Sequence, residues 1–125
     1  MAARFSPDLL ARLAAAEEVE IETRMGDAAP AHRTIIWIVV DAAGHVLVRT
    51  FLGPGSRWYR EIRVRPDCVL HLGDLAVPVT AVPAVRRSLV AACSHGYRQK
   101  YAAHRATARM LAAENLPTTL QLLAR

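Results

Sequence analysis

Hydrophobic and polar residues follow two different periods along the chain, which predicts a mixture of strands and helices. Residues Val19 to Met25 alternate strictly, with charged side chains opposite apolar ones, as expected for a half-buried strand. The stretch Arg33 to Val40 is nearly all apolar and rich in β-branched residues, which indicates a strand buried on both faces. Four further strands, making six in all, are predicted at 45–51, 68–72, 75–82 and 118–123.

Helical periodicity begins near the start of the chain. Ser6-Pro7-Asp8 combines a hydroxyl cap, a proline at the first helical position and an acid in the first turn, which predicts a helix over 7–17. A second, short helix is expected from Arg57 to Val64, with Ser56 as its cap, ending before Pro66.

The longest helical region runs from about 88 to 114, with an interruption near Gly96 or near His104. Gly73-Asp74 separates two of the strands and predicts a two-residue hairpin, and Pro78 places the following strand at an edge or a bulge. Short strands with short connections favour a small antiparallel barrel with helices, an α+β fold that is mainly β. We expect one domain over 1–125, divided into an N-terminal helix (1–17), five strands with a short helix (18–83), a helical region (84–116) and a closing strand (117–125).

Composition narrows the class of protein. The 125 residues are 53% hydrophobic, enough for one well-packed domain, and no apolar run is long enough to cross a membrane. The first residues lack the apolar stretch of a secretory signal, so a cytoplasmic location is expected. Cys68 and Cys93 have no metal-ligand spacing and are predicted to be buried thiols.

Charge and motifs exclude several functions. The net charge of +5 permits anionic ligands, but acids interleave with the arginines, and this pattern argues against nucleic-acid binding. The sequence has neither the G-x-x-x-x-G-K nor the G-x-G-x-x-G phosphate motif, and it has no G-x-S-x-G elbow. Its five histidines lack metal-ligand spacing, so no metal site is predicted.

Three short clusters carry the candidate chemistry: Arg33-Thr34, Arg49-Thr50 and Ser56 to Arg60. If strands 33–40 and 45–51 form a hairpin, the first two clusters lie at one end of the barrel, and the loop 52–55 brings the third there. Guanidinium groups, hydroxyls and a helix N-terminus together favour a phosphate group, and two tryptophans offer flat surfaces for an aromatic ring. The candidate binding residues are therefore Arg33, Thr34, Trp37, Arg49, Thr50, Ser56, Arg57 and Trp58.

Each cluster also has a structural interpretation. Arg49 alone fits a solvated charge at a strand end, and Trp58 and Tyr59 fit core residues that cover one end of the barrel. The segment Tyr97 to Tyr101 fits one face of an amphipathic helix.

Six segments also carry a family resemblance, and they occur at Glu18–Arg24, Arg33–Val40, Val46–Thr50, Ser56–Arg60, Tyr97–Tyr101 and Thr118–Leu122. In this order they resemble the FMN-binding split-barrel superfamily, which includes pyridoxamine-phosphate oxidases and deazaflavin-dependent nitroreductases. They are most similar to the bacterial DUF2255 family. The resemblance covers residues 18 to 123.

The resemblance implies a six-stranded split barrel that forms a homodimer with flavin-type sites at the interface. It implies FMN or the deazaflavin coenzyme F420 as cofactor, with Arg33, Ser56 and Arg57 on the phosphate and Thr50 beside them. Trp37, Arg49 and Trp58 are then expected on the ring or substrate side. An apolar residue, Ile38 or its neighbour, replaces the oxidase lysine, which argues against pyridoxamine-phosphate oxidation.

Two functions remain open at this point. The first is an oxidoreductase that transfers hydride between the cofactor and a small organic substrate, with Tyr59 or Tyr101 as a proton donor if one is needed. The second is a non-catalytic dimeric module that stores or senses a flavin, a haem or another anionic aromatic ligand.

Overall fold

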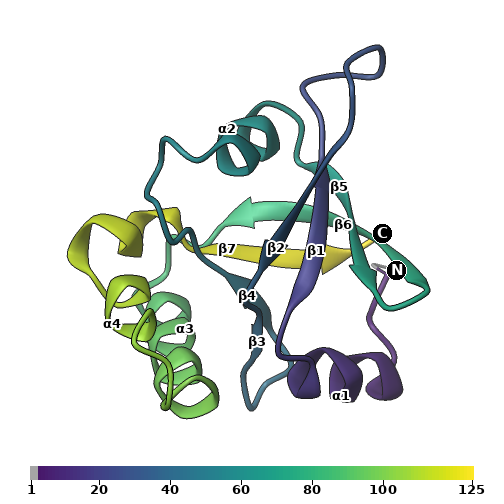
Figure 1. Cartoon of the computed structure of the whole chain (residues 1–125). Coiled ribbons are helices and arrows are strands. Elements are labelled where there is room, and N and C mark those ends of the chain that lie inside the picture. Colours follow the sequence, from purple (N-terminus) through teal and green to yellow (C-terminus); the bar gives the residue numbers. More distant parts are fainter. Residues whose placement is uncertain (1–2) are drawn as a thin grey trace.

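A single antiparallel sheet of seven strands forms the centre of the computed structural model, which describes residues 3–125. The sheet has the order β2-β1-β5-β6-β7-β4-β3 and curls into a half-barrel (Figure 1). The α+β class and the antiparallel arrangement of the strands were predicted from the sequence, and the structure confirms both. The strands are β1 (Val19–Thr23), β2 (His32–Ile36), β3 (Val39–Val40), β4 (Val46–Val48), β5 (Asp67–Leu72), β6 (Leu75–Pro83) and β7 (Leu120–Ala124).

The seventh strand arises because the expected strand 33–40 is divided at Trp37 and Ile38. Its first part, β2, pairs with β1, and its last two residues, β3, pair with β4. Between them, the Trp37 carbonyl accepts a hydrogen bond from Tyr97 Oη (3.2 Å) and the Ile38 carbonyl accepts one from Lys100 Nζ (2.7 Å). The Ile38 N–H donates to Tyr101 Oη (3.3 Å). Because helix side chains satisfy these backbone groups, the chain can leave one strand pair and enter another.

Within the described residues, four α-helices and one 3-10 helix surround the sheet. They are α1 (Pro7–Ala15), α2 (Arg57–Val64), α3 (Arg87–Lys100), α4 (Thr107–Met110) and the 3-10 helix η1 (Ala113–Thr118). Ser6 caps α1 as predicted, since its Oγ accepts a hydrogen bond from the Leu9 N–H (3.1 Å). The main helical region breaks at residues 101–106, around His104, whereas Gly96 lies within α3.

The hairpin predicted at Gly73-Asp74 is present. Leu72 pairs with Leu75 across the turn, and Gly73 adopts a φ of +60°, which glycine tolerates without strain. The strand β6 lies between β5 and β7, but β7 pairs only with Val79 to Pro83. Pro78 therefore lies just beyond the part of β6 that β7 pairs with.

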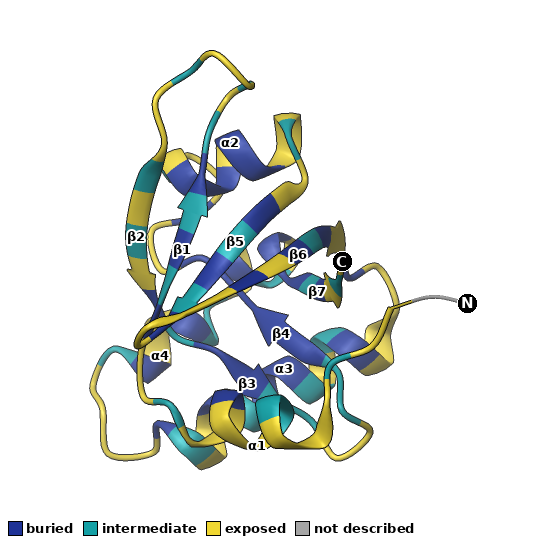
Figure 2. Cartoon of the chain, turned by 90° about the vertical axis from the view of Figure 1, so that its right-hand side faces the viewer, coloured by how far each residue is buried: buried dark blue, intermediate teal, exposed yellow. Residues whose placement is uncertain are grey.

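The hydrophobic core divides into two clusters on the two sides of the curled sheet. The larger, which includes Ile21 and Leu70, is covered by α1 and α2. The smaller joins Val39 and Leu47 to Tyr97 and the rest of the inner face of α3. Figure 2 shows the buried residues concentrated in the central strands and on the sheet-facing sides of the helices. Both clusters contain a cysteine, and the prediction of free, buried thiols is confirmed for Cys68 and Cys93.

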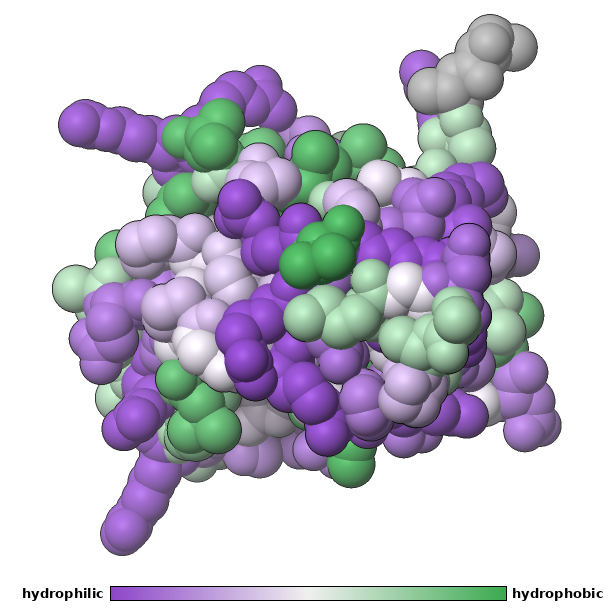
Figure 3. All heavy atoms as spheres, turned by 90° about the horizontal axis from the view of Figure 1, so that it is seen from above, coloured by the Kyte–Doolittle hydropathy of each residue, from purple (hydrophilic) through white to green (hydrophobic). Residues whose placement is uncertain are grey.

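The surface is mainly hydrophilic on the face shown in Figure 3, where hydrophobic side chains form small separate areas. Across residues 3–125, no helix combines the length and the apolar character that a membrane span requires.

Candidate functional site

A cavity of about 450 Å³ opens between α2, the end of β2, the segment after β4 and the α4 region. Helices α2 and α4 lie on the same side of the molecule, on the left of Figure 1. Six of the eight predicted binding residues line the cavity: Thr34, Trp37, Arg49, Ser56, Arg57 and Trp58. Its other lining residues are Glu18, Ile35, Ile36, Phe51, Leu52, Ala106 and Met110.

Arg33 is one of the two predicted residues that do not line the cavity. Its side chain is exposed and forms an ion pair with Glu20 on the neighbouring strand (3.1 Å). The expected hairpin between 33–40 and 45–51 is wrong for this part of the chain, because β2 pairs with β1 and only Val39–Val40 pair with β4. The assumed register therefore does not bring Arg33 beside Arg49.

Thr50 is the second predicted residue that does not line the cavity, and it is buried in a network of hydroxyl and amide groups. Its Oγ1 donates to Asn115 Oδ1 (3.0 Å) and contacts Thr118 Oγ1 (2.8 Å). Asn115 Nδ2 in turn donates to the carbonyls of Phe51 (3.2 Å) and Arg109 (2.9 Å). This network holds the segment after β4 against η1. Thr50 therefore helps to position the neighbouring residues Phe51 and Leu52, which line the cavity. Asn115 was not a candidate in the sequence analysis, because no local pattern places it beside Thr50.

Arg49 is completely buried, which contradicts its interpretation as a solvated strand-end charge. Its guanidinium donates to Thr119 Oγ1 (2.8 Å), to Ser94 Oγ (2.9 Å) and to the carbonyls of Met110 (3.0 Å) and Val90 (3.1 Å). It joins α3, the end of α4 and the residue before β7, and it also lines the cavity. These partners lie 41 to 70 positions away in the chain, which is why local patterns do not reveal them.

The N-terminus of α2 contributes positive charge to the cavity. The helix begins at Arg57 as predicted, but Ser56 does not cap it: its hydroxyl donates to the Gly53 carbonyl (2.8 Å). Within the described chain no side chain caps this end, and no acid lies in its first turn. Proteins commonly bind phosphate groups with free N–H groups at a helix N-terminus, the helix dipole and a guanidinium, and this end of α2 has all three.

Two tryptophans give the cavity flat apolar walls. Trp58 is buried and contacts Tyr59 edge to face, with ring centroids 6.2 Å apart. Trp37 is half-buried and lies parallel to Tyr101, with centroids 4.1 Å apart and an interplanar angle of 2°. Trp58 and Tyr59 thus belong to the core, as their structural interpretation proposed, while Trp58 also lines the cavity.

The two tyrosines considered as proton donors have other partners. Tyr101 Oη donates to the Glu17 carbonyl (2.6 Å), and burial raises the pKa of Tyr101 to about 12. Tyr59 Oη accepts a hydrogen bond from Arg63 Nη1 (3.2 Å). Neither side chain lines the cavity.

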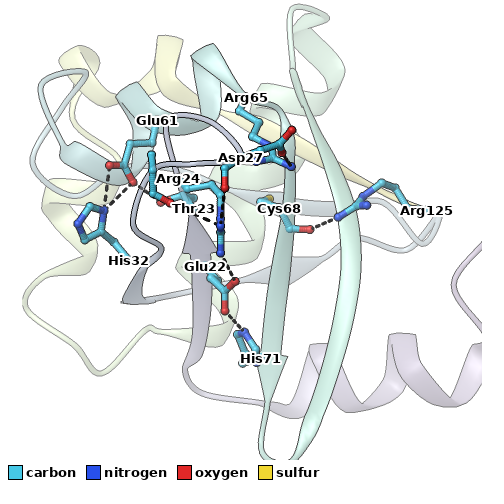
Figure 4. A network of polar contacts seen from close by, with 11 residues as sticks. Glu22, Thr23, Arg24, Asp27, His32, Glu61, Arg65, Cys68, His71 and Arg125 are labelled. Carbon is cyan, nitrogen blue, oxygen red and sulfur yellow. Dashed lines mark hydrogen bonds and ion pairs between the residues drawn. The ribbon is translucent and has the colours of Figure 1, made fainter.

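A buried carboxylate, missed by the sequence analysis, anchors α2 to the sheet (Figure 4). Glu61 lies one turn after Arg57, accepts a hydrogen bond from Thr23 Oγ1 (2.8 Å) and pairs with His32 Nδ1 (3.0 Å). Burial by itself raises the pKa of Glu61, but these two partners and the nearby Arg57 charge lower it overall. Glu61 therefore remains ionised and holds α2 in place. Across residues 3–125, His, Cys, Asp and Glu side chains form no cluster of three or more suited to a metal ion.

A second, more open groove of about 850 Å³ lies along α3 and residues 39–43. Five of its thirteen lining residues are alanines, and the amine of its lysine, Lys100, already donates to the Leu13 (3.2 Å) and Ile38 carbonyls. Compared with this groove, the cavity beside α2 combines apolar walls with convergent polar groups, which is the usual character of a ligand site.

Known structures share this architecture over almost the whole chain. The conserved hypothetical protein Rv2991 of Mycobacterium tuberculosis is 14% identical, with a TM-score of 0.70 over 99% of this chain and 82% of that one. HutZ, the heme storage protein of Vibrio cholerae, is 12% identical, with a TM-score of 0.67 over 98% and 92% of the two chains. A proposed pyridoxamine 5′-phosphate oxidase of Listeria innocua is 13% identical, with a TM-score of 0.62 over 94% and 90%. These similarities define the fold as a split barrel of the pyridoxamine-phosphate-oxidase type.

The family follows from the sequence itself. The profile of DUF2255, described as "Uncharacterized protein conserved in bacteria", matches residues 9–122. The chain belongs to this family, as the motif resemblance indicated. No curated protein matches the chain.

Proposed function

We propose that the cavity binds a flavin-type cofactor, FMN or F420, and that the protein is an oxidoreductase that transfers hydride to or from a small organic substrate. The observation that carries this proposal is the composition of the cavity wall. Two tryptophans and several apolar side chains lie in the same 450 Å³ space as the positive N-terminus of α2. This volume falls within the range of roughly 300–1,000 Å³ that is typical of small-molecule sites.

The residues present fit the two chemical parts of such a cofactor. Arg57 and the first N–H groups of α2 form the phosphate end, since they offer charge and hydrogen-bond donors, and Ser56 lines the cavity beside them. Trp37 and Trp58 form walls for the ring. When bound, the cofactor supplies the hydride chemistry, while the chain orients the ring and excludes water from one side of it.

We further propose that a second copy of the chain completes the site. Three apolar side chains that line the cavity are strongly exposed: Ile35 (61%), Phe51 (43%) and Leu52 (70%). Exposed apolar side chains that gather at one place favour a protein interface. The family resemblance supports a homodimer with its sites at the interface. A monomer mass by light scattering at micromolar concentration contradicts this part of the proposal.

We also infer a cytoplasmic location, because both cysteines are free thiols rather than a disulfide. Measuring the protein in the soluble and secreted fractions of the source cell tests this inference. Recovery outside the cell overturns it.

The decisive experiment is a titration of the purified protein with FMN and, in parallel, with F420, followed by tryptophan fluorescence. Because Trp37 and Trp58 line the cavity, binding is expected to quench their emission. Arg57→Met is expected to weaken the affinity by about 1.5–3 kcal/mol, the usual contribution of a charged hydrogen bond. Arg60→Met is the matched control, since Arg60 is exposed on the same helix and does not line the cavity. Failure of both cofactors to bind rejects the redox function.

The alternative is a non-catalytic module that binds haem, which the similarity to HutZ supports. The lining residues, all of them within 3–125, include no histidine or cysteine, and Met110 is their one side chain that commonly ligates haem iron. This composition favours a flavin-type ligand. A haem titration that gives a sharp Soret band in the wild type, lost in Met110→Leu, supports the alternative instead.

A further inference from the structure

The positive charge of Arg49 is buried without a counter-ion. Its side chain is 1% exposed, and its four hydrogen-bond acceptors are two hydroxyls and two backbone carbonyls, all of them neutral. Among residues 3–125, the ion pairs of the structure involve other basic groups and leave Arg49 without a carboxylate. A buried charge is strongly unfavourable unless an opposite charge compensates it. The four neutral acceptors orient the guanidinium but do not neutralise it.

The guanidinium also keeps one N–H donor that has no acceptor among its hydrogen bonds. A guanidinium carries five N–H donors, and the four hydrogen bonds leave one donor on Nη2. Arg49 is also one of the residues that line the cavity. The other charged residues of the lining, Arg57 and Glu18, are exposed, and water screens them. Of the charged residues in the lining, Arg49 is therefore the buried one, whose charge water screens least.

Trp37 presents a prepared stacking surface in the same cavity. One face of its ring is covered by Tyr101 at 4.1 Å, and His104 packs against it edge to face at 5.0 Å. These contacts hold the indole in place while the residue still lines the cavity. A planar ring that enters the cavity can stack on Trp37 without reorganising it.

We propose that the inner part of the cavity recognises an aromatic ring that carries a negative charge. The ring packs on Trp37, and its anionic edge becomes the missing counter-ion of Arg49. This recognition is separate from the phosphate end at Arg57. The inference deepens the proposed function, on which it rests for the identity of the occupant, by stating the charge that the ring must bring.

The test compares two probes of the same shape, 2-naphthoate and 2-naphthamide, which differ in charge at neutral pH. Their affinities are measured by tryptophan quenching in wild-type protein at 0.05 M and at 0.5 M NaCl. The expected result is that naphthoate binds at least about tenfold more tightly, as a charged hydrogen bond predicts. The preference is expected to persist at high salt, because salt screens exposed charges far more than buried ones.

Three variants test whether the preference comes from Arg49. Arg49→Met is expected to abolish the preference for naphthoate while retaining affinity for naphthamide, which shows that the cavity is intact. Arg60→Met serves as the matched control and is expected to leave the preference unchanged, since Arg60 is exposed and does not line the cavity. Arg49→Lys is expected to retain the preference, because it keeps the charge.

The wild-type measurement decides the matter even if Arg49→Met does not fold. Equal affinities for the two probes overturn the inference, and so does a preference that disappears at 0.5 M NaCl or in Arg60→Met. The outcome is separable from that of the proposed function. If FMN and F420 bind but the probes show no preference, the inference alone fails; if the preference holds but neither cofactor binds, the proposed function fails, and the anionic ring belongs to another ligand.

Discussion

Replacing Gly96 by alanine should destabilise the protein, although alanine is the better helix former. Gly96 lies inside α3, where the helix packs on β3. A β-carbon at this position would lie 2.8 Å from Val39 Cβ, and 3.0 and 3.1 Å from the two γ-carbons of Val39. These distances are shorter than ordinary carbon–carbon contacts of about 3.5–4.0 Å.

The magnitude follows from two opposing terms. Alanine in a helix interior is favoured over glycine by about 1 kcal/mol. Overpacking a core costs about 1–3 kcal/mol, and the upper part of this range applies here. The reason is that the closest contact involves Val39 Cβ, which side-chain rotation cannot move. We therefore expect Gly96→Ala to lower the free energy of unfolding by about 1–2 kcal/mol.

Urea unfolding at 25 °C, followed by tryptophan fluorescence, measures this loss. Ala91→Gly, at an exposed position of the same helix, gives the helix-propensity term by itself and should cost about 1 kcal/mol. Val39→Ala in the Gly96→Ala background removes the γ-carbons but not the closest contact, so it should restore only part of the loss. A Gly96→Ala protein as stable as the wild type refutes the close approach of α3 to β3.

Three further predictions concern polar groups. Glu61→Gln should destabilise the protein at neutral pH. Because the folded pKa of Glu61 lies below its ordinary value of 4.5, the difference in stability between this variant and the wild type should shrink as the pH falls below about 4.5. Urea titrations at pH 7 and pH 3.5 measure this change. Burial lowers the pKa of Lys100 from 10.5 to about 8, so the unfolded chain holds a proton that the folded chain loses between these values. The stability of the wild type relative to Lys100→Met should therefore rise from pH 8 upward, and a flat difference between pH 7 and 9.5 contradicts this. Asn115→Ala leaves the buried partners of its amide unsatisfied and should cost about 2–3 kcal/mol, visible as a lower Tm, with exposed Glu114→Ala as the control.

Several parts of the fold were predictable because their causes are local. The cap of α1 at Ser6, the start of α2 at Arg57 and the turn at Gly73 depend on residues within a few positions of one another. The same holds for the grouping of polar atoms at residues 56–58, since helix geometry alone brings the Ser56 hydroxyl, the Arg57 side chain and free N–H groups to one place.

The division of 33–40 into two strands was not predictable, since its apolar pattern fits one continuous strand. It depends on Tyr97, Lys100 and Tyr101, whose polar atoms satisfy the backbone at Trp37 and Ile38. The placement of Arg33 outside the cavity follows from the same division, because β2 pairs with β1 rather than with β4.

The sequence by itself thus determined the starts of α1 and α2, the turn at Gly73 and the alternation of β1. These features arise from backbone geometry and side-chain period, which act over a few residues. Only the tertiary structure decided which residues share a cavity and which charges are buried. Arg49 shows the reason: its partners Ser94 and Thr119 come from distant segments, and their hydroxyls, together with two carbonyls, keep a guanidinium inside the protein that the local pattern places in water.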